Sequence, residues 1–257
     1  MRLSQFIAAI FLAICLTFML TIDRLGHLFD DYRAKDSVIK YNELLATPFE
    51  SAFKDYYAKQ LDSLSIKRSE GFNEIFLLAR EQSNKTGKSV TVVETGSMRR
   101  SIFLFSGDGS STLIFNHFVN DKQGKVYTVD LDSRCKEIIE NIYQLKNVYS
   151  YSMDSVEYLK NFPNPQDITI LYLDSFDVDF KNPEASANHH LKEIKVIFDK
   201  LSPGTIIAID DNKVIDGKST GKGYLVEEFF KNNSVPLIYD GYIKIFQIES
   251  KPKLQDN

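Results

Sequence analysis

The sequence predicts a doubly wound α/β fold, with a mostly parallel sheet of seven strands covered by helices on both faces. First, four short apolar segments each end in an acidic residue, and stretches of helical pattern separate them. Second, only Asp240-Gly241 joins the last two apolar segments, and a link this short makes them antiparallel. In such a sheet the carboxyl ends of the parallel strands share one edge, where ligands bind.

Strands and helices are expected to alternate from residue 89 onward. The strand segments are rich in Val, Ile and Leu, and the helical segments carry apolar residues at helical spacing. The expected strands cover Ser89–Glu94, Lys125–Asp130, Val148–Met153, Ile168–Leu173, Thr205–Ile209, Val235–Tyr239 and Tyr242–Ile248; the expected helices follow Ser110 or begin at Ser133, Asp154, Ala185 and Gly223. A further apolar helix, Gly71–Arg80, is expected to pack on the sheet just before the first strand.

The first 68 residues differ in character from the rest of the chain. Residues 6–22 carry no charge and approach the length that a membrane-spanning helix needs. A signal peptide and a buried soluble helix are the alternatives, but the segment ends without the small residues of a cleavage site. We therefore predict an anchor over residues 1–24, a helical stalk or cap over 25–68, a main domain over 69–250 and a tail over 251–257.

Charge and cysteine content exclude some classes of protein. The formal net charge is -4, with acidic and basic residues mixed, so no nucleic-acid partner is expected. The two cysteines cannot form a disulfide framework. Arg24, Arg33 and Lys35 outnumber Arg2 and weakly favour a cytoplasmic side for the main domain, with the membrane as a partner of the N-terminal helix.

Four short motifs lie in the segments that follow the first, fourth and fifth predicted strands, at the predicted ligand-binding edge. They read Glu94-Thr-Gly96, Gly107-Asp-Gly-Ser-Ser-Thr112, Leu173-Asp-Ser175 and Asp210-Asp-Asn212. In this order, and with the antiparallel ending, the set resembles the class I S-adenosylmethionine-dependent methyltransferases, whose sheet is Rossmann-like. The resemblance covers roughly residues 71–248 and implies S-adenosylmethionine as the cofactor.

The resemblance also implies a set of cofactor-binding residues. Asp130, at the tip of the second strand, accepts hydrogen bonds from both ribose hydroxyls in this interpretation. Gly96 and Gly109 allow the backbone to approach the cofactor, and Asp154 either contacts the adenine amine or caps a helix, two roles that are compatible. The full set is Glu94, Thr95, Gly96, Gly109, Ser110, Asp130, Leu131, Asp154 and Asp174.

Catalysis admits two interpretations. Similarity to the catechol-type O-methyltransferases implies a divalent cation such as Mg²⁺ on Asp174, Asp211 and Asn212, which are all oxygen ligands. Without a metal, Asp174 or Asp177 is expected to act as a general base whose pKa neighbouring acids raise. His190 is a third catalytic candidate, with a packed histidine as the alternative.

The expected function is methyl transfer to an oxygen or nitrogen of a small-molecule or glycan-like acceptor. One alternative is a membrane-anchored binding or scaffold protein that keeps the fold without catalysis. Another is an NAD-dependent oxidoreductase, but the stretch from Gly96 to Gly107 is too long for the compact turn that binds a pyrophosphate. Arg99 and Arg100 lie in this stretch and either bind an anionic group or form solvated surface.

Overall fold

The structure is a computed structural model that describes residues 21, 25–26, 29, 31–62, 66–102, 110–121 and 123–252. Its centre is a seven-stranded sheet with the order β3-β2-β1-β4-β5-β9-β8. The strands are β1 (Thr91–Thr95), β2 (Lys125–Asp130), β3 (Val148–Ser152), β4 (Ile170–Leu173), β5 (Ile206–Ile209), β8 (Leu237–Asp240) and β9 (Lys244–Gln247). The predicted Rossmann-like α/β sheet of seven strands is therefore confirmed.

The end of the sheet is antiparallel, as the Asp240-Gly241 pair predicts. β1 to β5 pair in parallel, whereas β9 runs antiparallel to both β5 and β8. Asp240 pairs with Lys244, so the connection holds three residues rather than the expected two. The hairpin brings Tyr242 to the carboxyl edge, where its backbone carbonyl accepts a hydrogen bond from the amide of Asn212.

A second, two-stranded sheet was not expected from the sequence. β6 (Asn212–Ile215) and β7 (Lys218–Gly221) form an antiparallel hairpin between β5 and the next helix. Asp216 and Gly217 have φ values of 51° and 73°, the left-handed pair that a tight hairpin turn requires. This Asp-Gly pair was the sequence signal for the hairpin.

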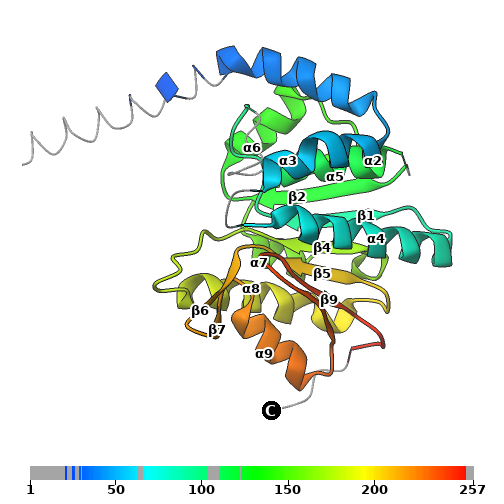
Figure 1. Cartoon of the computed structure of the whole chain (residues 1–257), viewed down its shortest axis with the longest axis vertical. Coiled ribbons are helices and arrows are strands. Elements are labelled where there is room, and N and C mark those ends of the chain that lie inside the picture. The colour runs from blue at the N-terminus through cyan, green and yellow to red at the C-terminus, as the bar shows by residue number, and fades with distance from the viewer. Residues whose placement is uncertain are drawn as a thin grey trace, which may run out of the picture.

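Helices cover both faces of the sheet (Figure 1). One face carries a helix over residues 31–45, α2, α3, α4 and α5, and the other carries α7, α8 and α9. The bounds are α2 (Phe49–Ala52), a π-helical turn (Phe53–Tyr57), α3 (Ala58–Leu61), α4 (Arg68–Thr86), α5 (Ser111–Asn120), α6 (Ser133–Glu137), a second π-helical turn (Ile138–Ile142), α7 (Ser155–Lys160), α8 (Glu184–Ile197) and α9 (Tyr224–Asn232), with short 3-10 turns at Pro165–Asp167 and Phe198–Lys200.

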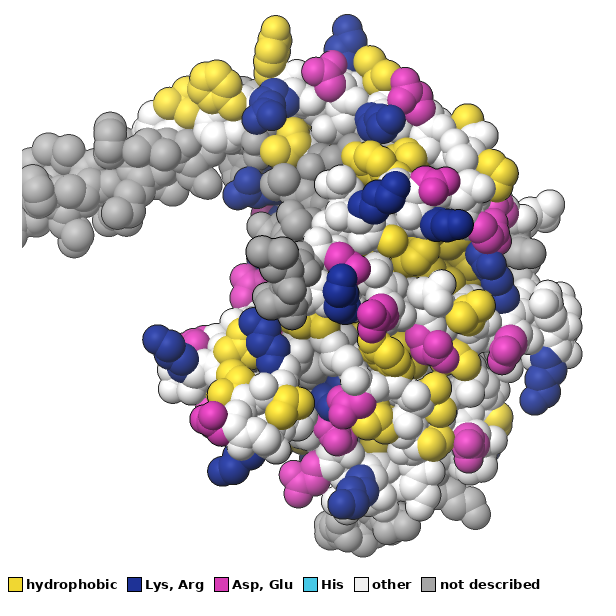
Figure 2. Space-filling view, viewed as in Figure 1, with side chains coloured by type: hydrophobic (Ala, Val, Ile, Leu, Met, Phe, Trp, Pro, Cys, Tyr) yellow, Lys and Arg dark blue, Asp and Glu magenta, His cyan; other side chains and the backbone are white. Residues whose placement is uncertain are grey.

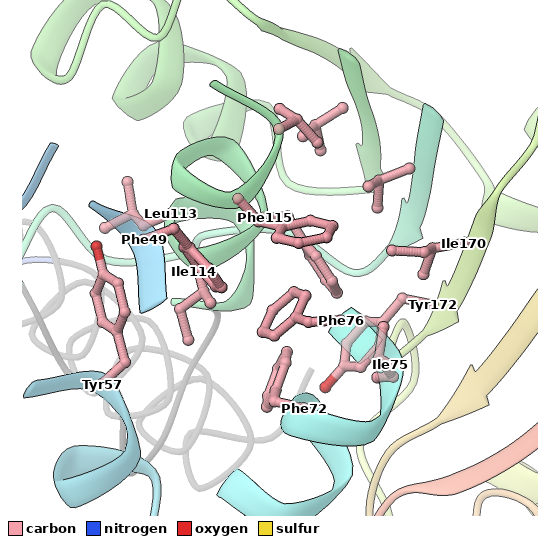
Figure 3. Close-up of a cluster of buried hydrophobic side chains, with 14 of the residues drawn as sticks. Phe49, Tyr57, Phe72, Ile75, Phe76, Leu113, Ile114, Phe115, Ile170 and Tyr172 are labelled. Atoms are coloured by element: carbon pink, nitrogen blue, oxygen red, sulfur yellow. The ribbon is translucent and has the colours of Figure 1, made fainter. Parts of the chain in front are cut away.

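An aromatic cluster joins α4 and α5 to the central strand β4 (Figure 3). The ring centroid of Tyr172 lies 5.6 Å from that of Phe72 and 5.1 Å from that of Phe115. Phe76 packs edge-on against Phe115 at 6.1 Å. These contacts fix the position of Tyr172, whose hydroxyl reaches the carboxyl edge of the sheet.

The segment expected to be a stalk or cap packs into the same core. Tyr41 donates a hydrogen bond to the carbonyl of Leu113 at 2.8 Å, and Tyr57 donates one to Nδ1 of His117 at 3.0 Å. Tyr41 and Tyr57 are buried with α4 and α5 in one hydrophobic cluster. Residues 31–61 thus hold α5 in place on the sheet.

The predicted anchor lies almost wholly outside the described residues, since only Thr21 of the 6–22 segment is described. Within the described part of the chain, no helix has both the length and the apolar character needed to span a bilayer.

Truncation of Phe76 tests the aromatic cluster. Phe76 is 3 % exposed, so Phe76→Ala should lower the free energy of unfolding by about 3–5 kcal/mol. Leu77, next to it on α4, is 47 % exposed, and Leu77→Ala should cost less than about 1 kcal/mol. Urea unfolding measures both variants, and equal losses would contradict the assignment of the core face.

Candidate active site

The loop after β1 lies directly against the end of β4. Gly96 has a φ of +81°, and a Cβ at this position would lie 2.5 Å from the backbone oxygen of Asp174. Only glycine permits both the backbone angle and the close approach. Gly96 therefore brings the predicted cofactor loop and Asp174 to one point on the carboxyl edge.

Glu94 is a fully buried carboxyl group at the start of this loop. Its Oε2 accepts a hydrogen bond from Thr112 on α5 at 2.6 Å, while Oε1 has no partner among the described residues. Burial raises the pKa of Glu94 to about 7, although nearby hydroxyl groups, including that of Thr112, oppose the rise. A buried carboxyl oxygen without a donor is costly and suggests a missing ligand.

Other buried polar atoms in the neighbouring segments also lack partners. In the described structure they are Thr95 Oγ1, Ser97 Oγ and Ser110 Oγ, from the end of β1, its loop and the start of α5. Because successive side chains of a strand point to opposite faces, Thr95 lies on the other face of the sheet from Glu94. The predicted Gly109, and Gly107 before it, lie outside the described residues.

Asp130 ends β2 beside this loop. Its Oδ2 accepts the backbone N–H of Ser97 at 3.1 Å, and its Oδ1 accepts that of Asp132 at 2.9 Å. Each oxygen keeps a lone pair for a further donor, such as a ribose hydroxyl. The two amides fix the carboxylate in the position that the resemblance implies.

A small hollow of about 60 Å³ lies next to Asp130. Leu131, which is 76 % exposed, and Phe176, which is 44 % exposed, offer apolar surface to it. Asp154 also lines the hollow, and its side chain caps α7 by accepting the N–H of Glu157 at 3.0 Å. The capping role is confirmed, and the adenine contact stays a prediction.

Lys222 lies between two aspartates at the ends of β4 and β5. Its side chain is 1 % exposed, and its ammonium donates to Asp174 Oδ1 and lies 2.9 Å from Asp211 Oδ2. Burial opposes the charge, but Asp174 and Asp211 raise the pKa of Lys222 above its ordinary value. For Asp211, burial acts to raise the pKa, yet Lys222 and the Tyr242 hydroxyl lower it overall.

A second buried cation, Arg68 at the start of α4, pairs with Asp210. Arg68 also donates to the Tyr172 hydroxyl at 3.1 Å, and that hydroxyl donates to Asp210 Oδ2 at 2.5 Å. Burial raises the pKa of Asp210 to about 6, although Arg68 acts in the opposite direction. The raised carboxyl pKa values of the site thus belong to Glu94 and Asp210.

The predicted Mg²⁺ site on Asp174, Asp211 and Asn212 is not supported. The Lys222 ammonium already bridges the two aspartates. The Asn212 amide is used within the fold, because Nδ2 donates to the carbonyl of Ile209 at 2.7 Å and Oδ1 accepts the N–H of Gly223 at 2.8 Å. No group of three His, Cys, Asp or Glu side chains in the described ranges has the geometry to hold a metal ion.

Asp177 does not have the raised pKa expected of a base at this position. Arg99 donates two hydrogen bonds to its carboxylate, at 3.2 and 3.0 Å, and these lower the pKa of Asp177. The Asp177 side chain is 75 % exposed. The expectation of a raised pKa is wrong for this residue, and Arg99 joins the loop after β1 to the loop after β4.

His190 lies inside the fold rather than on the edge. It is 0 % exposed, and Nδ1 donates to the Ser186 carbonyl at 2.8 Å. Burial lowers its pKa. This environment fits the packed histidine that was the alternative, and a catalytic role for His190 stays a prediction that the geometry does not favour.

Sequence reasoning missed the residues that neutralise the aspartates. The sequence alone assigns no role at the site to Arg68 or to Lys222. A usable signal was the charge balance, since three carboxylates at one buried edge require cations nearby. No local sequence pattern indicates that Tyr172 and Tyr242 contact these aspartates.

A second hollow of about 580 Å³ lies between the start of α4, β6 and the β8–β9 hairpin. Tyr239 and Tyr242 line it, together with Glu70, Asp240 and Lys213. The Tyr242 hydroxyl donates a hydrogen bond to Asp211. The Tyr242 side chain therefore lies between this hollow and the charged cluster of Lys222, Asp174 and Asp211. Acidic and basic side chains are interspersed on the face that Figure 2 shows.

No protein-family model matches the chain, and no curated protein matches it. Among solved structures, the O-methyltransferase NovP shares 12% identity with a TM-score of 0.51, over 83% of this chain and 99% of that one. The TDP-rhamnose 3'-O-methyltransferase of calicheamicin biosynthesis shares 13% with a TM-score of 0.47, over 83% and 93%. Fibrillarin from Aeropyrum pernix, with bound S-adenosyl-L-methionine, shares 12% with a TM-score of 0.42, over 66% and 75%.

At these identities the likeness concerns the fold. The chain has the fold of the class I S-adenosylmethionine-dependent methyltransferases, and NovP, which aligns over nearly its whole length, carries that comparison.

The buried Glu94 should make the unliganded protein less stable as the pH rises. With a pKa raised from 4.5 to about 7, the folded state binds more protons than the unfolded state between these values, so the free energy of unfolding falls across that window. Glu94→Gln should remove this loss and gain about 2–3 kcal/mol at pH 8. Urea unfolding at pH 5 and pH 8 measures it, with the exposed Glu81→Gln as the control; an unchanged pH slope in Glu94→Gln would contradict the prediction.

Removal of the Lys222 ammonium should leave Asp174 and Asp211 without their shared cation. We expect Lys222→Met to lower the free energy of unfolding by about 3–5 kcal/mol at neutral pH. Lys218→Met, at an exposed position of β7, is the matched control. Wild-type stability for Lys222→Met at neutral pH would show that the cluster does not depend on this cation.

Proposed function

We propose that this protein is an S-adenosylmethionine-dependent methyltransferase that acts on an oxygen or nitrogen of a small-molecule or glycan-like acceptor. One observation carries the proposal. On a sheet with the methyltransferase strand order, Glu94 holds a buried carboxyl oxygen without a partner in the described structure, at the same carboxyl edge as a fixed Asp130 carboxylate. A cofactor with a charged amino-acid end and a ribose would satisfy them.

Each part of the cofactor has candidate contacts among the residues of this edge. Asp130 would accept the ribose hydroxyls through the lone pairs that its two amide contacts leave open. Glu94 would accept a hydrogen bond from the amino group of the methionine end. The hydroxyls of Ser97 and Ser110 are further candidate contacts, since each is buried without a partner in the described structure. Leu131 and Phe176 would flank the adenine in the small hollow, with Asp154 at its rim.

S-adenosylmethionine supplies, when bound, the methyl group to be transferred. The chain must hold the acceptor in line and, for a hydroxyl acceptor, remove its proton. Asp174 is the candidate base because its side chain is 19 % exposed and it adjoins Gly96 of the cofactor loop. Lys222 fixes one of its oxygens, and the other lies 3.6 Å from Arg68.

The larger hollow is our candidate for the body of the acceptor. It lies at the same carboxyl edge, on the other side of Tyr242 from the charged cluster. Its volume of about 580 Å³ is within the usual range of small-molecule pockets. The hydroxyls of Tyr239 and Tyr242, with the charged side chains beside them, can form hydrogen bonds with a hydroxylated acceptor. The O-methyltransferase activity named for NovP supports oxygen as the accepting atom.

Calorimetric titration tests the cofactor. We expect S-adenosylmethionine and S-adenosylhomocysteine to bind, and NAD not to bind, with or without Mg²⁺. Asp130→Asn should weaken S-adenosylhomocysteine binding by about 10–100-fold, the effect of losing hydrogen bonds to a charged acceptor. Asp132→Asn is the matched control, because asparagine can still cap α6 as Asp132 does.

Other outcomes of the titration would support a different function. Binding of NAD alone would support an oxidoreductase. Absence of binding by all of these compounds would support a binding or scaffold protein that retains the fold. Equal losses in the two Asn variants would contradict the role of Asp130.

A further inference from the structure

We propose that His189 and Glu193 of α8 form a positioning pair that joins the two walls of the cofactor hollow, so that cofactor affinity depends on the positive charge of His189. The inference rests on the proposed function, since the hollow is assigned to S-adenosylmethionine. It concerns a pair of residues that lie outside the four motifs of the edge.

The pair connects two separate elements. His189 Nε2 lies 2.9 Å from the Ser155 hydroxyl, in the first turn of α7, and 3.4 Å from Glu193 Oε1. The same Glu193 oxygen accepts a hydrogen bond from the Ser175 hydroxyl at 2.7 Å, in the loop after β4. One carboxylate and one imidazole thus link the start of α7 to the end of β4.

The linked residues are the walls of the hollow beside Asp130. Ser155, Ser175 and His189 all line it, and so does Phe176, whose ring centroid lies 5.4 Å from that of His189. Glu193 is 0 % exposed and does not line the hollow, so it acts through the residues that it holds. A loss of the link would let the Ser155 wall and the Phe176 wall move apart.

Charge is what makes the link strong. A fully buried carboxylate is unfavourable unless cations or donors surround it. Burial acts to raise the pKa of Glu193, yet the neighbouring His190 and His189 lower it to about 2, so the group is ionised. The contact with Glu193 raises the pKa of His189, whereas burial lowers that of His190, so His189 is the histidine that carries the charge.

Few other charges face this pair. Asp154, at the cap of α7, also raises the pKa of His189, and Lys192 on α8 lowers it. Lys222, before α9, acts on His190 and adds to the lowering of its pKa. The hydrogen bond and charge of Glu193, with the smaller effect of Asp154, outweigh burial and Lys192, which both lower the pKa of His189, so that pKa lies above its ordinary value.

The sign of the pH effect follows. Below the raised pKa of His189 the imidazolium is present and the walls are joined by a charge-assisted contact. As the pH rises through that pKa the charge is lost, and Glu193 keeps only neutral donors. Cofactor affinity should therefore fall on the alkaline side, whereas ionisation of Glu94 near pH 7 acts in the opposite direction and must be separated from it.

His189→Gln separates the two effects, because the amide keeps a donor near the position of Nε2 but does not titrate, and Glu94 is unchanged. At pH 6 we expect His189→Gln to bind S-adenosylhomocysteine about tenfold more weakly than the wild type, with a dissociation constant about tenfold larger. This is the difference between a charged and a neutral donor. The ratio should shrink to about twofold or less at a second pH, chosen above the His189 pKa that histidine NMR locates. Lys192→Gln, an exposed charge on the same helix, is the control and should change binding less than about twofold at both pH values.

Histidine NMR on the full chain gives an independent measurement, because the sequence has only four histidines. One imidazole should titrate above 6.5 and be absent from the spectrum of His189→Gln. A constant ratio of affinities across pH, with normal binding, would overturn the pair as a positioning device. If the wild type binds no S-adenosylhomocysteine at any pH, the proposed function fails; a titrating His189 would then show a purely structural pair, which also overturns the inference.

Discussion

Two buried cations allow three aspartates to meet at the carboxyl ends of β4 and β5. Lys222 joins Asp174 to Asp211, and Arg68 neutralises Asp210. Because Arg68 opens α4 on one face of the sheet and Lys222 precedes α9 on the other, the ion pairs also tie both helical layers to this edge. The rest of the site is arranged around that charge balance, since a carboxylate left alone there would be strongly unfavourable.

Residues of the hydrophobic core hold the charged side chains of the site in position through a few direct contacts. Tyr172 packs in the aromatic cluster and places its hydroxyl on Asp210. On the same face of the sheet, Tyr57 and His117 fix α5, whose Thr112 holds Glu94. Residues that precede the sheet in the sequence thereby control the orientation of the Glu94 carboxylate near the end of β1.

The metal prediction failed for an instructive reason. Asp174, Asp211 and Asn212 are a reasonable oxygen set, but an ammonium can satisfy the same carboxylates as a divalent cation. The decisive residue, Lys222, lies 48 positions from Asp174, and nothing in the local sequence joins them. Asp177 gives the same lesson, because Arg99, 78 positions away, reverses the pKa shift that neighbouring acids suggested.

The sequence by itself determined the strands, their parallel pairing, the antiparallel end at Asp240-Gly241 and the edge at which Glu94, Asp130 and Asp174 gather. These features depend on local periodicity and on the length of connections, which the residue order contains. Only the tertiary structure decided the partner of each charged group, the β6–β7 hairpin beside Lys222, and the link between His189 and Glu193. Ion pairs and burial join residues that are distant in the chain, so they become defined only when the elements pack.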